Sequence, residues 1–421
     1  MDKRTKKTPT FKLTDYLTFI VSIFFIAYYF LRLFGFFIDA ITFVIPMIIA
    51  VGYMLITMEW SEKTLTYIVG IVALILGIVC VELFCTNNFT FPAFVSMFVQ
   101  LSMNMFPLYL VYTILKTKNK QLLLWIVSIF CVVLAYVLIL TFIELSRDDR
   151  FMREMDINYT NYRLYNTSNA GGFQFAYAVA VLIGFLISLL LLPYKKYSKI
   201  KKVGLSVALI LAFLLVLNSS YTLALMISLI SIIIAVALKI ENTTTKVLCI
   251  LLSILAIFAI IALSDWIIRL MPTEEMRIRL KEVFMFLKSG DASGYNLNGR
   301  FMLYGRAILS FFRSPLLGNE KLSFDPHSSI LRFFAKDGIL GGIGYVMLYV
   351  IAYRIITRYF IKEEQKKLFL PTFIALILMG LVNPIHSVGT VHYIAFFIVP
   401  LALNLIQTEK KELFNETRLG N

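Results

Sequence analysis

The sequence predicts an all-α membrane protein whose helices cross the bilayer many times. Three observations support this fold class: 59% of the 421 residues are apolar, only 15% are charged, and the mean hydropathy is +0.82. Soluble proteins are typically about 45–50% apolar and about 25% charged, so a soluble fold could not bury this much apolar surface. We therefore expect one integral membrane domain over residues 1–421.

Twelve apolar runs have about the length of a membrane span, since a helix of about 20 residues crosses the hydrocarbon core. They cover residues 14–34, 36–57, 65–85, 91–115, 121–144, 171–193, 203–218, 221–239, 246–264, 338–357, 368–384 and 389–407. An even number of spans predicts that both termini lie on the same side of the membrane.

Basic residues mark the side on which the termini lie. They cluster near the two termini and on alternate connections, at residues 1–7, 116–120, 193–202, 358–367 and 409–411. Loops rich in Lys and Arg stay in the cytoplasm, so both termini are expected there. Nearly all of the net charge of +15 then lies on the cytoplasmic side, where it sets the orientation of the spans. We therefore expect no nucleic-acid partner.

Two connections on the predicted outer side are long, at residues 145–170 and 265–327. Long structured loops are where function usually concentrates. In the larger loop, Thr273 begins a predicted amphipathic helix, which we expect to lie flat on the bilayer surface. Its apolar face comprises Met276, Leu280, Val283, Phe284 and Leu287.

A second predicted helix follows in the same loop over residues 300–313, and Pro315 and Gly318 stop it. Arg306 and Arg313 are seven residues apart and share one face of this helix. The loop then leads through His327 to the next helix, for which Ser328 or Ser329 is the expected cap.

The outer side carries the residues that could bind and transfer a phosphorylated group. The sequence has neither a phosphate-binding loop nor a dinucleotide fingerprint, so we expect no nucleotide chemistry and no cofactor. Arginine matches phosphate oxygens as a charged fork, and histidine supplies a base near neutral pH. We expect His327 to act as the base, and a lipid-linked phosphate or diphosphate to bind Arg163, Arg300, Arg306, Arg313 and Arg332.

Structural roles are the alternatives for the same residues. Exposed arginines also bind lipid head groups or pair with loop acids, and a histidine beside a helix cap can be purely structural. From composition alone, an enzyme and a transporter are equally compatible with the chain. Asp39 and Glu82 lie near predicted span ends and can reach the interface, which argues against a proton relay at the membrane centre.

Other polar and sulfur-containing residues favour packing roles. His386 and His392 are six apart rather than three or four, so no metal site is expected. Gln100 and Asn104 could line a polar path, but a hydrogen bond to a neighbouring helix is the favoured role. The cysteines fall within or at the edges of spans and are interpreted as small apolar fillers: Cys80, Cys85, Cys131 and Cys249.

Residues 299–342 resemble the signature segment of the O-antigen polymerase and ligase superfamily. The shared pattern is Gly-Arg, an aromatic residue, Ala, a Pro-Leu-x-Gly turn, a His and a Gly-Ile-Leu-Gly run. Here its positions are Gly299, Arg300, Tyr304, Ala307, Pro315, Leu316, Gly318, His327, Gly338 and Gly341. A weaker similarity is Asn169, which matches an asparagine that the family places before a span, with Arg163 just upstream.

The chain also departs from the family pattern at three positions, of which one, Tyr221, lies outside this segment. Ser328 stands where the family often has Asn, and Glu320 where a second Gly is common. Tyr221 replaces an arginine that would anchor the diphosphate.

The resemblance implies an inverting, metal-independent glycosyl transfer on a fold similar to the C-type membrane glycosyltransferases. The implied substrate is an oligosaccharide on undecaprenyl diphosphate, and the implied place is the outer face of a bacterial plasma membrane. His327 would be the catalytic base, while Asn169, Tyr221 and the arginines would bind substrate. Membrane lipids, a flippase and a chain-length regulator are the other implied partners. A polysaccharide polymerase is the leading hypothesis, and a ligase of finished chains or a saccharide-lipid exporter is the alternative.

Overall fold

The computed structural model describes residues 12–31, 39–58, 62–85, 90–152, 169–192, 199–219, 221–271, 273–289, 295–319 and 326–406. Every regular element within these ranges is a helix. The predicted class, an all-α protein with many membrane spans, is confirmed for this part of the chain. The likeness to the C-type glycosyltransferase fold stays a prediction.

Ten helical segments in the described residues are long and apolar enough to cross a membrane. They are α1 (Leu13–Phe30), α3 (Glu62–Cys85), α4 (Phe91–Thr117), α5 (Lys120–Arg147), α8 (Phe173–Leu190), α9 (Lys199–Asn218), α10 (Thr222–Lys239), α15 (Ser329–Ile355) with η2 (Ile356–Phe360), α16 (Glu363–Val382) and the C-terminal helix Gly389–Ile406, which includes α17 (Gly389–Tyr393) and η4 (Ile394–Ile398). Each overlaps one of the twelve predicted spans.

The other two predicted spans also coincide with helices. α2 (Asp39–Thr57) provides a shorter apolar stretch, Val44–Thr57, and α11 (Thr243–Ala262) corresponds to the predicted span at 246–264. The total of twelve spans therefore stays a prediction.

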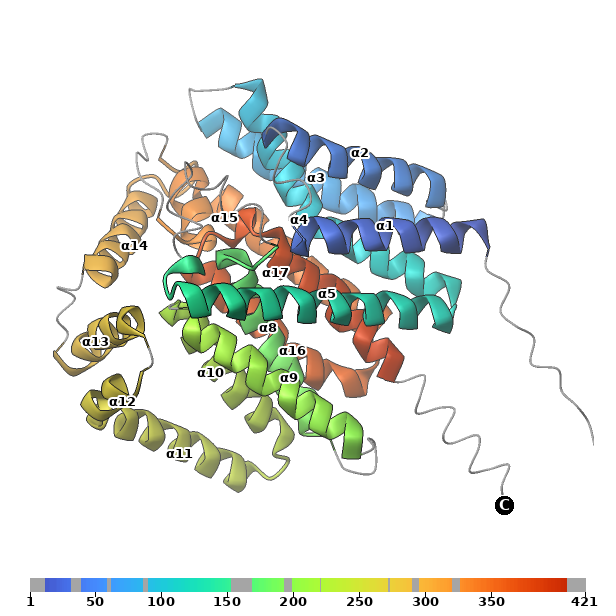
Figure 1. Cartoon of the computed structure of the whole chain (residues 1–421). Coiled ribbons are helices and arrows are strands. Elements are labelled where there is room, and N and C mark those ends of the chain that lie inside the picture. The colour runs from blue at the N-terminus through green and yellow to red at the C-terminus, as the bar shows by residue number, and fades with distance from the viewer. Residues whose placement is uncertain are drawn as a thin grey trace, which may run out of the picture.

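Three further helices lie together at one end of the bundle: α12 (Ser264–Leu270), α13 (Glu274–Ser289) and α14 (Tyr295–Arg313). α14 runs across the direction of the long helices (Figure 1). α1 begins, and the C-terminal helix ends, at the opposite end of the bundle (Figure 1). This arrangement has the short helices that the sequence predicts for the large loop. Which end faces outward stays a prediction.

The core of the bundle is centred on α8 and the C-terminal helix. In each of these two spans, 72% of the residues are buried, a larger share than in the other spans. α8 packs against α9, α10, α16 and α17. Small residues permit this close packing, since a Cβ added at Gly184 would lie 3.2 Å from the main chain of Pro371 in α16. Small residues at helix contacts are how membrane bundles bring backbones together.

A sharp kink in α15 fixes the position of α14. Gly338 has non-helical backbone angles (φ 67°, ψ −160°), and Gly318, in the turn after α14, has φ 78°. The backbone N–H of Ile339 donates to the carbonyl of Pro315 at 2.7 Å. A Cβ at Gly338 would lie 2.4 Å from the carbonyl oxygen of Leu316. Both glycines therefore allow the turn to dock directly on the kink.

α13 buries part of its predicted apolar face against the protein. Met276 and Phe284 of the predicted face are buried. Met276 and Leu280 line a small hollow together with Tyr221. The periodicity correctly predicts a helix here, and α11 and α12 pack against it. Its position on the bilayer surface stays a prediction.

Candidate functional site

A cluster of polar side chains connects α14 with α3, α15 and the segment that follows α16. We call it the polar cluster, and it consists of Glu82, Arg300, Tyr304, Ser329, Arg332, Lys336, Asn383 and His386. Helical spacing explains why single helices contribute several members, since residues three, four or seven apart share a face. Arg300 and Tyr304 come from α14, and Ser329, Arg332 and Lys336 from the first turns of α15.

Asn383, directly after α16, organises one half of the cluster. Its side-chain oxygen accepts hydrogen bonds from Arg300 Nη1 at 3.3 Å and from the hydroxyl of Tyr177 at 3.4 Å. Arg300 Nη1 and the Tyr304 hydroxyl also donate to the carbonyl of Val382, at 3.3 and 3.0 Å. These bonds hold α14 against the end of α16.

Asn383 has unused hydrogen-bonding capacity. The residue is 1% exposed, and its side-chain nitrogen has no hydrogen-bond partner within the described ranges. Buried amide nitrogens normally have a partner, so this donor is an exception within the cluster.

His386, in the short helix η3 (Ile385–Ser387), organises the other half. Its ring nitrogen Nδ1 is 3.0 Å from Ser329 Oγ, and Nε2 is 2.6 Å from Arg332 Nη1. The carbonyl of His386 accepts from the side chain of Asn104 at 2.7 Å. This last bond is the contact between neighbouring segments that the sequence favours for Asn104.

The protonation of His386 follows from its partners. Arginine stays protonated and can only donate, so Nε2 is the acceptor and Nδ1 carries the proton toward Ser329. Burial, together with the charge of Arg332, lowers the pKa of His386 to about 3. The ring is therefore neutral near pH 7, and its free electron pair is committed to Arg332. His386 positions the guanidinium and does not serve as a base in this arrangement.

Glu82 neutralises part of the positive charge of the cluster. Its carboxylate pairs with Lys336 and lies 3.6 Å from Arg332 Nη2. Glu82 is 8% exposed, so protein covers the side chain that the sequence places near the interface. The Arg332 side chain is 30% exposed and remains accessible beside this pair.

The cluster keeps an excess of positive charge. Its cations are Arg300, Arg332 and Lys336, against the carboxylate of Glu82. Asp337 is nearby in sequence, 1% exposed, and neither carboxyl oxygen has a hydrogen-bond partner in the described part of the chain. Even if Asp337 is counted as ionised, cations outnumber carboxylates, so the cluster suits an anionic ligand.

Tyr304 is a hydrogen-bond donor at neutral pH. Burial raises the pKa of its phenol, and the nearby Arg300 guanidinium opposes this shift. The hydroxyl therefore keeps its proton and holds the carbonyl of Val382.

His327 lies just outside the polar cluster, two residues before Ser329. It is exposed and has φ 50°, in the left-handed region. Histidine occupies this region more often than most residues, yet such backbone usually persists only where the surroundings enforce it. Ser328 caps α15, since its Oγ accepts from the N–H of Leu331 at 3.2 Å. Of the two predicted caps, Ser328 is therefore correct.

The other predicted site residues are distributed around the same end. Tyr221 donates to the carbonyl of Met152 at 2.9 Å and packs on the ring of Tyr177, 5.7 Å between centroids, which itself reaches Asn383. Asn169 is half-buried, four residues before α8 begins at Phe173. Arg163 lies outside the described residues.

Arg306 and Arg313 differ from Arg300 in their surroundings. Both are exposed on α14, whereas Arg300 is half-buried and bonded to Asn383. Of the five predicted phosphate-binding arginines, the described structure joins Arg300 and Arg332 to the polar cluster.

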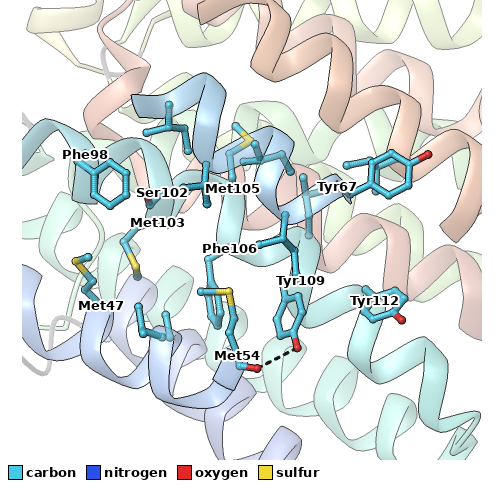
Figure 2. Close-up of a pocket in the computed structure, with 18 of the residues that line it drawn as sticks. Met47, Met54, Tyr67, Phe98, Ser102, Met103, Met105, Phe106, Tyr109 and Tyr112 are labelled. Carbon is cyan, nitrogen blue, oxygen red and sulfur yellow. Dashed lines mark hydrogen bonds between the residues drawn. The ribbon is translucent and has the colours of Figure 1, made fainter. Parts of the chain in front are cut away.

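A largely apolar cavity of about 490 Å³ lies between α2, α3, α4 and the segment around η2 (Figure 2). Its lining includes Met47, Ile71, Ile75, Ser102, Phe106 and Tyr109. Val51, Tyr67 and Val72 also line it and are exposed on the outside of the bundle. The cavity is therefore open to the outside of the bundle.

The cavity and the polar cluster share two helices. On α4, Ser102 and Met105 line the cavity, while Asn104 between them bonds to His386. On α3, Ile75 lines the cavity, and Glu82 of the polar cluster follows two helical turns further along. The apolar cavity thus lies close to the polar cluster.

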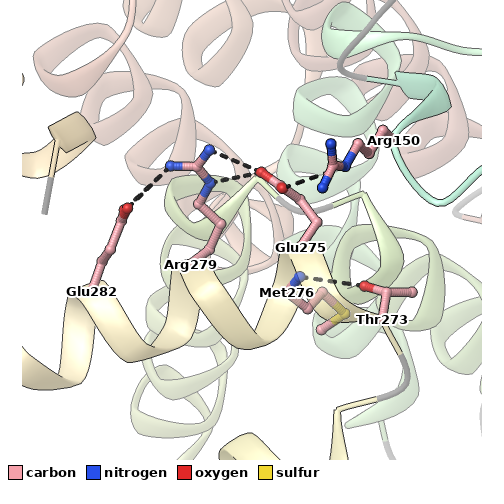
Figure 3. A network of polar contacts seen from close by, with 6 residues as sticks. All are labelled: Arg150, Thr273, Glu275, Met276, Arg279 and Glu282. Carbon is pink, nitrogen blue, oxygen red and sulfur yellow. Dashed lines mark hydrogen bonds and ion pairs between the residues drawn. The ribbon is translucent and has the colours of Figure 1, made fainter.

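The two long loops of the sequence prediction meet in a network of ion pairs (Figure 3). Arg150, just after α5, lies 3.8 Å from Glu275 of α13. Arg279 pairs with Glu275 at 2.8 Å and with Glu282 at 3.3 Å. Thr273 Oγ1 accepts from the N–H of Met276 at 3.3 Å, so Thr273 starts the helix as predicted. The network fixes α13 beside the end of α5.

The two histidines weighed as a metal pair have other partners. His392 Nε2 is 2.8 Å from the Tyr349 hydroxyl, and Nδ1 is 3.0 Å from the carbonyl of Val388. Both ring nitrogens of His386 are also engaged. Within the described ranges, no group of three or more His, Cys, Asp or Glu residues could hold a metal ion.

Sequence reasoning assigns a site role only to Arg300 and Arg332 and misses the other six members of the cluster: Glu82, Tyr304, Ser329, Lys336, Asn383 and His386. Lys336 follows Arg332 by one helical turn, a local signal for a shared cationic face. The role of Glu82 has no local signal, because its partner Lys336 is 254 residues away. No protein-family model matches the sequence, and no curated protein matches it either.

Proposed function

We propose that this chain is a polysaccharide polymerase of a bacterial plasma membrane. It transfers a growing saccharide from undecaprenyl diphosphate onto a lipid-linked repeat unit at the outer face. The observation that carries the proposal is the convergence of two arginines, Arg300 and Arg332, in one cluster with excess positive charge. Both come from the segment 299–342 that resembles the O-antigen polymerase and ligase superfamily.

Arg300 and Arg332 bind the diphosphate of the donor. Guanidinium groups match phosphate oxygens in pairs of hydrogen bonds, and they keep their charge. As the glycosidic bond to the diphosphate breaks, negative charge grows on the leaving group. Preplaced cations stabilise this charge most strongly in the transition state. Asn383 holds Arg300 in position, and Glu82 and His386 do the same for Arg332.

His327 is the base of the transfer. It takes the proton of an acceptor hydroxyl, whose oxygen forms a bond to the anomeric carbon of the donor. The bond from that carbon to the diphosphate oxygen breaks on the opposite face, which inverts the configuration. The exposed position of His327, two residues before the cluster, supports contact with a saccharide outside the bundle. The reaction uses no nucleotide, because the donor is already activated.

The apolar cavity holds part of the isoprenoid chain. Its volume of about 490 Å³ is comparable to that of a small-molecule binding site. Its lining suits a hydrocarbon, and its opening allows the remainder of a long chain to continue into the bilayer. The short path along α3 and α4 to the polar cluster suits a molecule with an anionic head and an apolar tail.

The test is glycosyl transfer by the purified protein with a lipid-linked repeat unit. Arg300→Lys keeps a charge but loses the fork, and we expect it to lower the rate by about 100-fold or more. His327→Ala should lower the rate by about 100- to 10,000-fold. Lys366→Gln, which removes an ion pair with the exposed Glu363, is the control and should retain activity. Unchanged polymer formation in both site variants would contradict the assignment.

The products distinguish the alternatives. A polymerase deletion leaves single repeat units on the carrier, whereas a ligase deletion leaves long chains. A purified exporter forms no new glycosidic bond. Transport of lipid-linked repeats without transfer would therefore replace the proposal with the exporter.

A further inference from the structure

α14 has two contrasting faces. One faces the protein, where Ala307 and Ser310 are buried and Arg300 and Tyr304 bond to the end of α16. The opposite face exposes large apolar side chains, and Phe312 is the most exposed at 71%. The others on this face are Phe301, Met302, Ile308 and Leu309. Water would oppose this exposure, so the face requires an apolar environment.

The exposed apolar face continues onto a membrane span. Leu316 and Leu317, in the turn after α14, are also exposed. The turn docks on the kink of α15, where the N–H of Ile339 bonds to Pro315. From there the exposed apolar surface runs along α15 through Ile339, Leu340, Ile343 and Met347. This part of α15 belongs to a span, so α14 extends the same hydrocarbon-facing surface.

The direction of α14 suits the plane of the membrane. It runs across the direction of the spans at the end of the bundle (Figure 1). It is not one of the helices in the described chain that are long and apolar enough to cross a membrane. A helix with one apolar face that lies across the spans fits the lipid–water interface.

The two exposed arginines lie along one edge of the apolar face. At about 100° per residue, Arg306 and Arg313 project within about 20° of each other and next to Met302. Neither has an ion-pair partner among the residues that the structure describes. Cations at the border of an apolar helix face are placed where lipid phosphates lie.

We propose that α14 lies in the lipid–water interface, with its apolar face among acyl chains and Arg306 and Arg313 bound to the phosphates of anionic phospholipids. The opposite face of the same helix carries Arg300 and Tyr304. The bilayer therefore fixes the orientation of one wall of the polar cluster. This inference stands independently of the proposed glycosyl transfer.

The first test measures the depth of α14. In the full-length protein without native cysteines, Phe312→Cys is labelled with the environment-sensitive dye NBD and reconstituted in phosphatidylglycerol-containing liposomes. Lys281→Cys on α13 is the matched control at an exposed, charged position. We expect blue-shifted NBD emission, quenched by lipid-borne nitroxides, at position 312 and not at 281. Water-like emission at both positions would overturn the proposal.

The second test concerns the arginines. Phosphatidylglycerol is titrated into the detergent-solubilised full chain, and the rise in Tm gives the half-maximal concentration. The double variant Arg306→Gln, Arg313→Gln should raise this concentration about 25-fold, since each arginine near an anionic surface contributes about fivefold. Lys281→Gln should leave it unchanged.

An unchanged half-maximal concentration in the double variant would contradict the lipid role. Loss of binding to a lipid-linked diphosphate with unchanged phosphatidylglycerol binding would likewise overturn the proposal, because it would assign both arginines to the substrate. Failure of the glycosyl-transfer assay leaves the NBD and titration results intact, so the two proposals fail separately.

Discussion

Arg332 and Arg313 are residues of one type in one sequence segment, yet their environments differ. Arg332 is partly covered, bonded to His386 at 2.6 Å and paired with Glu82 at 3.6 Å. Arg313 is exposed on α14 beside apolar side chains. The difference teaches that the partners of an arginine, more than its position in a motif, determine its chemistry. A positioned guanidinium can stabilise developing charge, whereas an exposed one acts at a surface.

The buried ion pair gives the largest expected effect on stability. Glu82→Gln removes the carboxylate between Lys336 and Arg332 and leaves two partly covered cations. Breaking a buried pair costs about 3–5 kcal/mol, so we expect a loss of about 4 kcal/mol, measured by unfolding in detergent. Glu363 is 85% exposed and pairs with the half-buried Lys366. Glu363→Gln should therefore cost less than about 1 kcal/mol. Equal losses in both variants would remove the contrast between covered and exposed pairs.

The glycine kink in α15, on which the turn after α14 docks, gives the next largest effect. Gly338→Ala places a Cβ 2.4 Å from the carbonyl oxygen of Leu316 at a positive φ. We expect a loss of about 3 kcal/mol in the free energy of unfolding. Gly305→Ala is the matched control, because nothing lies within 4 Å of its added Cβ. It should be neutral or stabilise α14 by up to about 1 kcal/mol. A tolerated Gly338→Ala would show that the turn does not dock as described.

Lowering the pH should destabilise the surroundings of the covered Arg332 before it affects the exposed Arg313. The pKa of His386 falls from an ordinary value of 6.5 to about 3 in the folded chain. The unfolded chain therefore binds more protons below about pH 6.5, so stability is lost as the pH falls from about 6.5 toward about 3. At pH 5 the loss from this residue is about 2 kcal/mol.

The pH dependence is measured by unfolding at pH 7 and pH 5. His386→Asn removes the titrating ring, and the pH-dependent loss should be smaller by the same amount. An identical loss in this variant would assign the acid sensitivity to other groups.

Tyr304 gives the smallest of these effects. Tyr304→Phe removes the 3.0 Å hydrogen bond to the carbonyl of Val382. The loss should be about 1 kcal/mol. The rate of transfer should also fall, because Arg300 on the same helix face loses a neighbouring contact.

The control for Tyr304 is Tyr136→Phe, at an exposed ring on α5. Surface substitutions of this kind change stability by about 0.5 kcal/mol or less. Equal stability and equal transfer rates in the two variants would leave Tyr304 without a positioning role.

Apolar run length and helical periodicity together are a strong signal for the helices, because burial in a bilayer depends on length and composition. The ten span-length helices and the two short loop helices follow from that signal. The cap at Ser328 and the start at Thr273 are also local features. The sequence predicts Gly318 as a helix stop and Gly338 only as part of a family pattern, and the structure gives the physical reason for both, a turn docked on a kink.

The site is only partly predictable, because some of its contacts join residues that are far apart in the sequence. Glu82 and Lys336 are 254 residues apart, and no local pattern predicts their pairing. The inward face of α13 is similar, since amphipathicity shows that a face is buried without naming its partner. Helix spacing does place Arg306 and Arg313 together, but it does not separate them in function from Arg300.

The most direct test of the central claim compares Arg332→Lys with Arg313→Lys in one transfer assay. Both variants keep their charge, so a difference isolates the positioned fork. With purified protein and a lipid-linked repeat unit at saturating concentration, we predict a fall of about 100-fold or more for Arg332→Lys and less than about twofold for Arg313→Lys. Equal falls, or a larger fall for Arg313→Lys, would contradict the assignment of the diphosphate to the polar cluster.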